Sequence, residues 1–327
     1  MKVKAIAMFS GGLDSILASK LMLEQGIDLE AVHFDIGFYS YKSGASPNPR
    51  VSAEELGIPL KVLDVSEDFL EVLKAPRHGY GSNLNPCIDC RIFTLNKTKK
   101  LMEETGAKFI VTGEVLGERP MSQKRNTLEL IDRNSELEGL ILRPLSARLL
   151  EPTMPEKEGW VKREGLLDIE GRSRKPQLRL AAEFGIKKYP APAGGCLLTD
   201  PIFSHKLKDL MYYGDLNLDN ISLLRLGRYF RLSPGMKVIV GRNEGENKKI
   251  MDYAGPGDTV FRVVDSPGPV ALARGEGIEN FIDQICRNIA SYADEVDHGQ
   301  IKILLKREAP HFLEIRHLSC KGGCCSD

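Results

Sequence analysis

KAIAMFSGGLDS, residues 4–15, is an apolar run followed by a pair of glycines and a short polar segment. The apolar run suits a buried strand, and from Leu13 to Glu24 the apolar side chains recur at helical spacing. Gly11 and Gly12 allow the backbone between them to turn tightly with its amide groups facing a ligand. Because the N-terminus of a helix carries a partial positive charge, we predict that this turn binds phosphate.

The side chains of the turn also suit a nucleotide. Ser10 and Ser15 can donate hydroxyl groups to phosphate oxygens, and Asp14 can hold Mg²⁺ or orient the turn. No lysine follows, so this is not the G-x-x-x-x-G-K-[ST] loop of common NTPases. It also lacks the third glycine of the dinucleotide motif G-x-G-x-x-G. The alternative is a simple glycine turn capped by serine.

The pattern of strand followed by helix continues through the N-terminal half. Further strands are predicted at 29–37, 59–66 and 107–115, and further helices at 48–57 and 89–106, the first with Ser52 as its N-cap. This alternation predicts an α/β fold with a doubly wound parallel sheet. Ligands of such sheets bind beyond the carboxyl ends of the strands, which here carry the sequences MFSGG, HFDIG and VTGEV.

The chain length indicates more than one domain. The protein has 327 residues, of which 42% are hydrophobic and 28% charged, as in ordinary globular proteins. We place a nucleotide-binding domain at 1–150, a basic segment that completes it at 151–216, and a smaller α+β domain at 217–327 with a cysteine-rich tail. Lys plus Arg and Asp plus Glu number 45 each, so only local patches can indicate nucleic acid.

The N-terminus does not have the pattern of a signal peptide, and no apolar run approaches the length of a membrane span. We therefore expect a cytoplasmic protein with no membrane partner, whose thiols stay reduced. The seven cysteines are also an odd number, which argues against a disulfide framework.

The sequence LNPCIDCRIF, residues 84–93, holds Cys87 and Cys90 in a C-x-x-C spacing. This spacing is compatible with a disulfide, half of a zinc site, a redox dithiol, or a site for an iron–sulfur cluster or sulfur transfer. Both cysteines fall at a predicted helix start, where the pKa of a thiol is commonly lowered. Asp89 between them is expected to be a helix N-cap carboxylate, with a role as acid or base as the alternative. Cys286, in an apolar helix, is expected to be a core residue.

SGGLDS after a first strand resembles the pyrophosphate loop of the N-type ATP pyrophosphatases. That resemblance covers about residues 1–210 and implies the adenine-nucleotide α-hydrolase fold. It implies cleavage of ATP between its α and β phosphates, transfer of AMP to a carbonyl oxygen, and displacement of that AMP by a nucleophile. The second strand's end, His33, Phe34 and Asp35, would hold adenine. The implied nucleotide-binding residues are Ser10, Gly11, Gly12, Asp14, Ser15, Phe34 and Gly113.

Within that family, Cys87, Cys90 and the distant Cys196 resemble the cysteines of the tRNA thiouridylases and, being three, those of the iron–sulfur-dependent tRNA thiolases. The resemblance implies that these cysteines and Asp14 are catalytic and that the cysteines are metal ligands. A [4Fe-4S] cluster on three thiolates leaves one iron open to bind sulfide. Two alternatives stay open: persulfide chemistry on low-pKa thiols without a cluster, and zinc, which needs four closed ligands.

Two groups of cations are candidates for contact with RNA, with a solvated surface as the alternative. They are Arg119, Lys124 and Arg125 after the fourth strand, and Arg172, Arg174 and Lys175 in the basic segment. We expect the second group to act apart from the phosphate turn, which lies at the other end of the domain's sequence. The C-terminal domain resembles the RNA-binding module of ribosome-quality-control and fibronectin-binding-like proteins.

These features predict an ATP-dependent tRNA uridine thiolase that forms 2-thiouridine or 4-thiouridine, with ATP, Mg²⁺ and a [4Fe-4S] cluster as cofactors. Its partners would be tRNA and a sulfur donor, either sulfide or a persulfide carrier. One alternative is another adenylating enzyme on the same fold, either a small-molecule sulfurtransferase or an amide-forming ligase. The other is a non-catalytic protein that binds RNA or metal. No role is predicted for the tail cysteines Cys320, Cys324 and Cys325.

Overall fold

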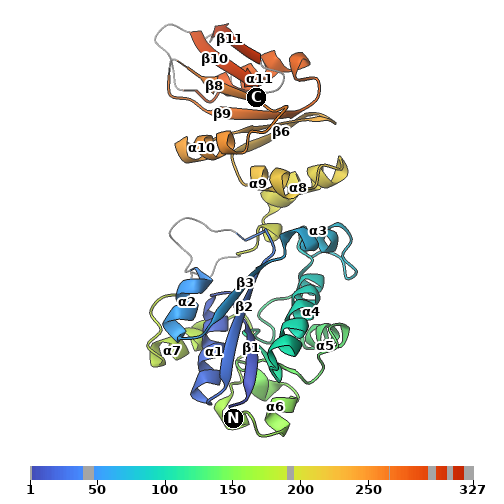
Figure 1. Ribbon diagram of the computed structural model, residues 1–327, viewed down its shortest axis with the longest axis vertical. Helices are drawn as coiled ribbons and strands as arrows, with labels where there is room; N and C mark the ends of the chain where they lie inside the picture. The colour runs from blue at the N-terminus through green and yellow to red at the C-terminus, as the bar shows by residue number, and fades with distance from the viewer. Residues whose placement is uncertain are drawn as a thin grey trace. The chain divides into compact units, whose positions relative to one another are not determined.

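The computed structural model describes residues 2–39, 48–189, 195–264, 266–293, 300–307 and 312–319, and the tail cysteines Cys320, Cys324 and Cys325 lie outside these ranges. The chain forms two compact units, residues 1–201 and 202–327 (Figure 1).

The boundary between the units differs from the expected start of the second domain near residue 217. The second unit also takes in most of α8 (Pro201–Tyr212) and α9 (Leu218–Leu224). Ion pairs explain the difference, because Arg231 of the second unit contacts Asp209 at 2.7 Å and Asp215 at 2.9 Å.

The first unit is built on a five-stranded parallel sheet in the order β3-β2-β1-β4-β5, which confirms the predicted fold class. The strands are β1 (Lys4–Met8), β2 (Asp28–Asp35), β3 (Leu60–Asp64), β4 (Phe109–Thr112) and β5 (Ile141–Leu142). Ala5 of β1 is in register with Leu29 of β2 on one side and Phe109 of β4 on the other. The chain winds in opposite directions from β1, so the winding changes between β1 and β4, and ligands of such sheets bind beyond the strand ends at that point.

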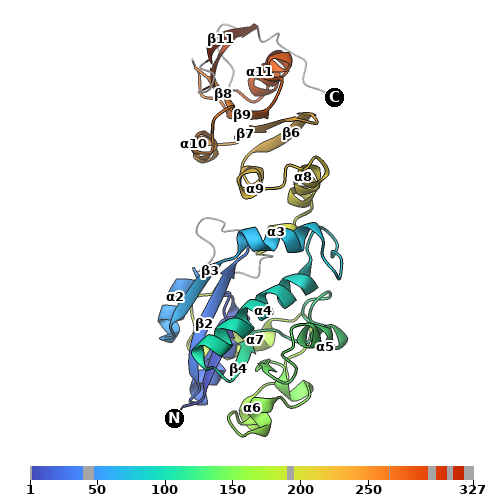
Figure 2. The same cartoon turned by 45° about the vertical axis from the view of Figure 1, so that its right-hand side comes forward.

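Helices cover both faces of this sheet (Figures 1 and 2). Ala5, Ala7 and Phe9 pack into the core beneath α1, whereas Met8, which points to the opposite face, contacts Arg91 of α4. The α1 face carries α1 (Leu13–Glu24), α2 (Pro49–Leu56) and α7 (Lys175–Glu183). The opposite face carries α3 (Ser66–Lys74), α4 (Cys87–Thr105) and α5 (Arg125–Asn134), and the short α6 (Met154–Lys157) follows β5.

The N-cap predicted for α2 is wrong. Asn48 caps the helix by accepting a hydrogen bond from the Arg50 amide at 3.1 Å, and Gly57 ends it with a left-handed φ of 67°. Ser52 lies inside the helix and is buried. Pro49 accounts for the earlier start, because its fixed φ and missing N–H suit the first turn of a helix.

The second unit contains a six-stranded antiparallel sheet in the order β11-β10-β8-β9-β7-β6. Its strands are β6 (Arg228–Ser233), β7 (Met236–Val240), β8 (Thr259–Val263), β9 (Val270–Gly275), β10 (Gln300–Arg307) and β11 (Phe312–Ser319). The helices α10 (Glu244–Asp252) and α11 (Ile282–Ala290) accompany it. Cys286 of α11 is 1% exposed, which confirms its predicted place in a core.

Candidate active site

The glycine turn folds as the sequence predicts, between β1 and α1. Gly11 has a φ of 72°, and a Cβ atom there would lie 3.0 Å from the Pro49 Cα atom. The Gly12 amide donates to Ser10 Oγ at 3.2 Å, and Ser15 Oγ donates to the Gly12 carbonyl at 2.8 Å. The two hydroxyl oxygens lie 3.2 Å apart. The serines therefore brace the turn while the first amides of α1 remain available to a ligand.

Gly113, just after β4, packs directly against this turn. A Cβ atom on Gly113 would lie 2.5 Å from the Ser15 nitrogen and 2.6 Å from the Asp14 carbonyl carbon. Such distances exclude any side chain at this position. The loop after β4 thus begins on the phosphate turn, at the point where the sheet changes its winding direction.

Asp14 is a half-buried carboxylate with two arginines close enough to act on it. Burial raises the pKa of Asp14, and the charges of Arg174 and Arg119 oppose that shift. Within the described ranges, the buried Oδ1 atom of Asp14 has no hydrogen-bond partner. A free carboxylate oxygen beside a phosphate turn fits Mg²⁺, which prefers oxygen ligands shared with substrate phosphates.

The expected separation of Arg174 from the phosphate turn is wrong. Arg174 immediately precedes α7, and α7 packs against α1, the helix that the turn opens. Its charge therefore reaches Asp14, and its buried Nε atom has no partner among the described residues. Arg172 and Lys175 on either side are exposed.

The end of β2 lies at the same edge of the sheet. His33 Nδ1 lies 2.9 Å from the Phe9 carbonyl and donates to it, because a carbonyl oxygen can only accept, and burial lowers the pKa of His33. Phe34 is 4% exposed, and Asp35 accepts a hydrogen bond from the Gly37 amide at 2.9 Å. His33 and Asp35 thus both support the backbone at this strand end.

The three cysteines of interest come from two distant segments. Cys87 is the first residue of α4 and Cys90 lies one turn further on. Cys196 forms a β-bridge with Tyr39, and the Leu197 amide donates to the Phe38 carbonyl at 2.8 Å, which places Cys196 beyond the end of β2.

A side-chain contact joins these two segments. Asn83 Nδ2 donates to the Thr199 carbonyl at 2.8 Å. Burial raises the pKa of Cys90, and the charges of Cys196 and Cys87 add to that rise. The two segments that carry the cysteines are therefore in contact through Asn83 and Thr199.

Two of these thiols are not activated by their surroundings. Burial raises the pKa of Cys90 to about 12 and that of Cys196 to about 11. The expectation of a low-pKa thiol at the helix start is therefore wrong for Cys90, because desolvation of the thiolate outweighs the helix N-terminus. Cys87 differs in accepting a hydrogen bond from Asn85 Nδ2 at 3.2 Å.

The cysteine set fits an iron–sulfur cluster in number and kind of ligand. In the part of the chain that the structure describes, no three His, Cys, Asp or Glu side chains stand together to bind a single metal ion. A four-iron cluster is larger than one ion, and its thiolate ligands stand further apart. Iron also removes the need for intrinsically acidic thiols, because a coordinating thiol is deprotonated by the metal.

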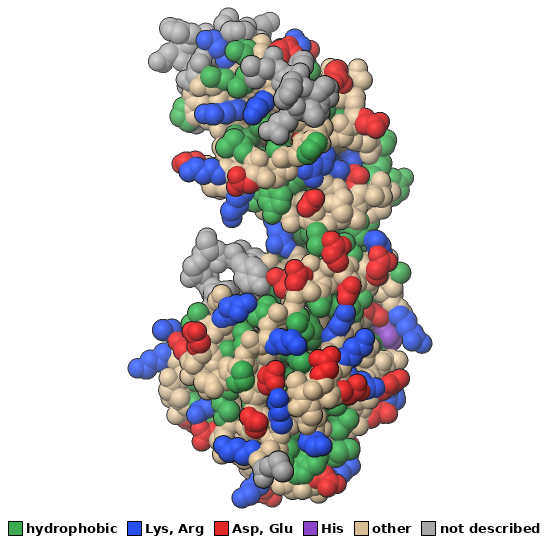
Figure 3. Space-filling model, in the orientation of Figure 1, with side chains coloured by type: hydrophobic (Ala, Val, Ile, Leu, Met, Phe, Trp, Pro, Cys, Tyr) green, Lys and Arg blue, Asp and Glu red, His purple; other side chains and the backbone are tan. Residues whose placement is uncertain are grey.

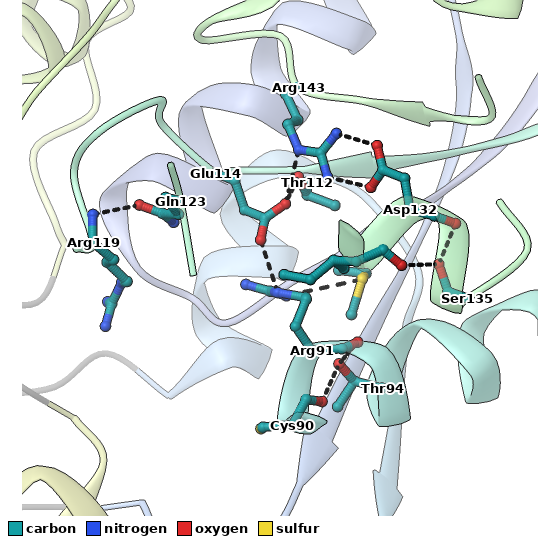
Figure 4. Close-up of polar contacts among 12 residues, drawn as sticks. Cys90, Arg91, Thr94, Thr112, Glu114, Arg119, Gln123, Asp132, Ser135 and Arg143 are labelled. Carbon is teal, nitrogen blue, oxygen red and sulfur yellow. Dashed lines mark hydrogen bonds and ion pairs between the residues drawn. The ribbon is translucent and has the colours of Figure 1, made fainter. Parts of the chain in front are cut away.

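A buried charge network links the cysteine helix to β4 (Figure 4). Glu114 is 1% exposed and contacts Arg91 Nε at 2.9 Å and Arg143 Nε at 3.0 Å. Arg143 also holds Asp132 through two hydrogen bonds, of 2.9 and 2.6 Å. Burial alone would raise the pKa of Glu114, but the charges of Arg91 and Arg143 outweigh it and hold that pKa below its usual value.

This network gives Glu114 a structural role, although the residue follows the strand end that carries Gly113. The side chain is occupied by two arginines, and one of them, Arg91, directly follows Cys90. Glu114 therefore positions the first turns of α4 against the strand end. Arg91, Asp132 and Arg143 had no signal in the sequence, because single charged residues form no recognisable pattern.

Asp89 has a structural role but is not the N-cap expected, because α4 begins after Pro86 and Asp89 lies inside its first turn. Its carboxylate accepts hydrogen bonds from the amides of Arg77 at 3.2 Å and His78 at 2.9 Å, and it lies 3.0 Å from His78 Nδ1. These contacts fasten the loop before α4 to the start of the helix.

The other candidates for RNA contact lie on the surface of the first unit. Arg119, Lys124 and Arg125 are exposed, although Arg125 donates to the Leu149 carbonyl at 2.8 Å. In the view of Figure 3, cations and anions are interspersed over the described surface of each unit. No helix of the described chain is both long and apolar enough to cross a membrane.

Two family models match the chain, one in each half. Residues 1–148 match the model described as thiamine biosynthesis protein (ThiI), and residues 227–319 match the model described as NFACT protein RNA binding domain. These matches confirm the resemblances inferred from the glycine turn with its cysteines and from the C-terminal domain.

Curated relatives match part of the chain. A probable tRNA sulfurtransferase of Lysinibacillus sphaericus is 35% identical over 147 residues, covering 43% of this chain and 34% of the relative. The probable tRNA sulfurtransferase of Streptococcus gordonii is 34% identical over 125 residues, covering 35% and 28%. The tRNA-specific 2-thiouridylase MnmA of Syntrophotalea carbinolica is 32% identical over 117 residues, covering 33% of each. The chain thus spans about a third of the length of these relatives.

Two solved structures are also similar. A 4-thiouridine synthetase in complex with RNA and bound ATP is 23% identical, with a TM-score of 0.37, covering 68% of this chain and 52% of that one. The U34-tRNA thiolase NcsA from Methanococcus maripaludis with its [4Fe-4S] cluster is 20% identical, with a TM-score of 0.35, covering 68% and 71%.

Proposed function

We propose that this chain, in which a ThiI-type domain precedes an NFACT-type RNA-binding domain, uses ATP to replace a carbonyl oxygen of a tRNA uridine with sulfur. The observation that supports the proposal is the closeness of two sites, the glycine turn and the cysteines. Burial raises the pKa of the Asp14 carboxyl and of the Cys196 thiol, and Arg119 is close enough for its charge to oppose both shifts. A nucleotide at the glycine turn and a sulfur atom at the cysteines would therefore face one another.

The glycine turn would perform the first step. The uridine carbonyl oxygen attacks the α phosphate of ATP, and pyrophosphate leaves. The amides at the start of α1, with Ser10 and Ser15, would hold the phosphates, as helix N-termini commonly do. Mg²⁺ on Asp14 would offset their charge, and Phe34 and Gly113 would line the nucleotide site.

The cysteines would perform the second step. A sulfur nucleophile forms a bond to the uridine carbon, and AMP leaves with the original carbonyl oxygen. Cys87, Cys90 and Cys196 would hold a [4Fe-4S] cluster, which when bound could offer an open iron to sulfide. Persulfide transfer between Cys90 and Cys196 is the weaker candidate, since it needs thiolates at sites where burial raises the thiol pKa.

Transfer RNA would be bound by exposed cations of the first unit and by the second unit. The candidates are Arg172 and Lys175 beside α7, Lys124 and Arg125 near α5, and the domain that matches the NFACT RNA-binding model. Such contacts are salt-dependent because they release counterions. Reaction on tRNA, with thiols kept reduced, also suits a cytoplasmic location.

The test is AMP formation by the anaerobically reconstituted protein. With ATP, Mg²⁺, sulfide and unmodified tRNA, AMP and pyrophosphate should form only when tRNA is present. AMP formation that needs a small molecule or an amine in place of tRNA would favour a small-molecule sulfurtransferase or a ligase. Absence of ATP binding would leave only a non-catalytic RNA- or metal-binding protein.

A further inference from the structure

The loop that leaves β4, residues 113–123, passes from the phosphate turn to the cysteine site. It begins with Gly113 in contact with the backbone of the turn. Near its end, Met121 Sδ lies 3.9 Å from Asn85 Nδ2, and the same amide group donates to Cys87 Sγ at 3.2 Å. A residue between these two points can reach both sites.

Arg119 occupies such a position and is held there by its backbone. Its amide donates to Gln123 Oε1 at 3.0 Å, and its carbonyl accepts from the Gln123 amide at 3.0 Å. Gln123 is 4% exposed, so this anchor is buried. Figure 4 shows the Arg119 guanidinium extending away from Gln123.

The guanidinium group itself is not paired with any residue that the structure describes. Over the described residues it makes no hydrogen bond or ion pair, whereas Arg91 and Arg143 are each paired with a carboxylate. Its charge nevertheless acts on both sides: it opposes the rise in pKa that burial causes at Asp14 and Glu118 on one side and at Cys196 on the other. An exposed arginine between two sites, unpaired yet fixed at its backbone, is available to a ligand.

We propose that Arg119 is a catalytic residue that binds the phosphate of the adenylated substrate on the side facing Cys196. This inference rests on the proposed function. When sulfur forms its bond to the uridine carbon, the carbon–oxygen bond breaks and its electron pair stays on the oxygen that leaves with AMP. The planar guanidinium can hold two phosphate oxygens at once and stabilise that charge.

The competing role for Arg119 is contact with the tRNA backbone, and substitution separates the two. Arg119→Gln removes the charge. Arg119→Lys keeps the charge but lacks the planar guanidinium group that can hold two phosphate oxygens at once. Arg133→Gln, an exposed arginine of α5, is the matched control. Each full-length protein is tested for ATP and AMP binding, for tRNA binding at several salt concentrations, and for AMP formation with tRNA and sulfide.

We expect Arg119→Gln to weaken AMP and ATP binding ~10-fold or more, as loss of a charge-assisted hydrogen bond does. The rate of AMP formation should fall by a larger factor than nucleotide binding. Arg119→Lys should restore part of the binding and part of the rate, and Arg133→Gln should match the wild type in both. The dependence of tRNA binding on salt should not change. If Arg119→Gln binds nucleotide like the wild type and lowers the salt slope for tRNA by about one, Arg119 is an RNA contact and the inference fails. If the wild-type chain itself binds no ATP, the proposed function fails as well.

Discussion

Glu114→Gln should destabilise the first unit, because it removes the central charge of the network between α4 and β4. Glutamine keeps the volume of the side chain but offers one carbonyl oxygen where glutamate offers two carboxylate oxygens. Arg143 Nε donates to one carboxylate oxygen of Glu114 at 3.0 Å, and Arg91 Nε forms an ion pair with the other at 2.9 Å. In the variant, one guanidinium must therefore face the amide N–H group.

The burial of the network sets the size of this effect. Removing one partner of a buried ion pair costs ~3–5 kcal/mol. Arg143 keeps Asp132, and the Arg91 side chain is 30% exposed, so both cations retain some compensation. We therefore expect a loss of ~3 kcal/mol in the free energy of unfolding, at the low end of that range.

Trp160 provides a specific assay. It is the single tryptophan of the chain, lies in the first unit, and stacks on Phe109 of β4 at a centroid distance of 6.3 Å. Its fluorescence during urea unfolding of the full chain thus reports this unit. With a typical urea dependence, the expected loss lowers the midpoint by ~1–2 M.

The matched control is Glu71→Gln, which removes an exposed ion pair with Lys74 on α3. It should change the free energy of unfolding by less than ~1 kcal/mol. The effect of Glu114→Gln should also depend on pH. Because the folded pKa of Glu114 is depressed, its stabilisation is present above the unfolded pKa of ~4.3 and is lost as pH falls through the folded value. A midpoint for Glu114→Gln equal to that of Glu71→Gln at neutral pH would refute the argument.

Three further outcomes are expected. Protein prepared without oxygen should be brown and contain iron and sulfide. Cys87→Ser should lose the iron, whereas the control Cys286→Ala should keep it. Colourless protein with stoichiometric zinc after reconstitution would contradict the cluster. Asp14→Asn should abolish ATP-dependent thiolation without loss of iron or a lower Trp160 unfolding midpoint, and thiolation at the wild-type rate would rule out the role of Asp14. Reversing two exposed charges, Arg172→Glu with Lys175→Glu, should weaken tRNA binding and lower the salt slope of that binding by about two. ATP binding should not change. An unchanged slope would show that this surface makes no contact with tRNA.

The sequence predicts those parts of the site that are formed by a contiguous stretch of residues with a clear periodicity. The glycine turn is contiguous and lies between a strand and a helix whose periodicities are clear, so its shape could be predicted from residues 4–24 alone. The helix beginning at Cys87 could be placed to within two residues for the same reason. Both depend only on backbone propensity and side-chain spacing.

The parts that could not be predicted depend on contacts between distant segments. Arg174 reaches Asp14 only because α7 packs on α1, and sequence separation had indicated the opposite. Glu114 and Arg143 meet through the pairing of β4 with β5. The raised pKa of Cys90 likewise follows from burial in the assembled site, not from its position in the helix.

The most direct test of the proposed function is the mass of the tRNA nucleosides after reaction. Unmodified tRNA is incubated anaerobically with the reconstituted protein, ATP, Mg²⁺ and isotopically labelled sulfide, then digested and analysed by mass spectrometry. We expect labelled thiouridine, formed in equal amount to AMP, with the protein and not with Cys196→Ser. Unmodified uridine alongside continued, tRNA-dependent AMP formation by the wild-type protein would contradict sulfur transfer to tRNA.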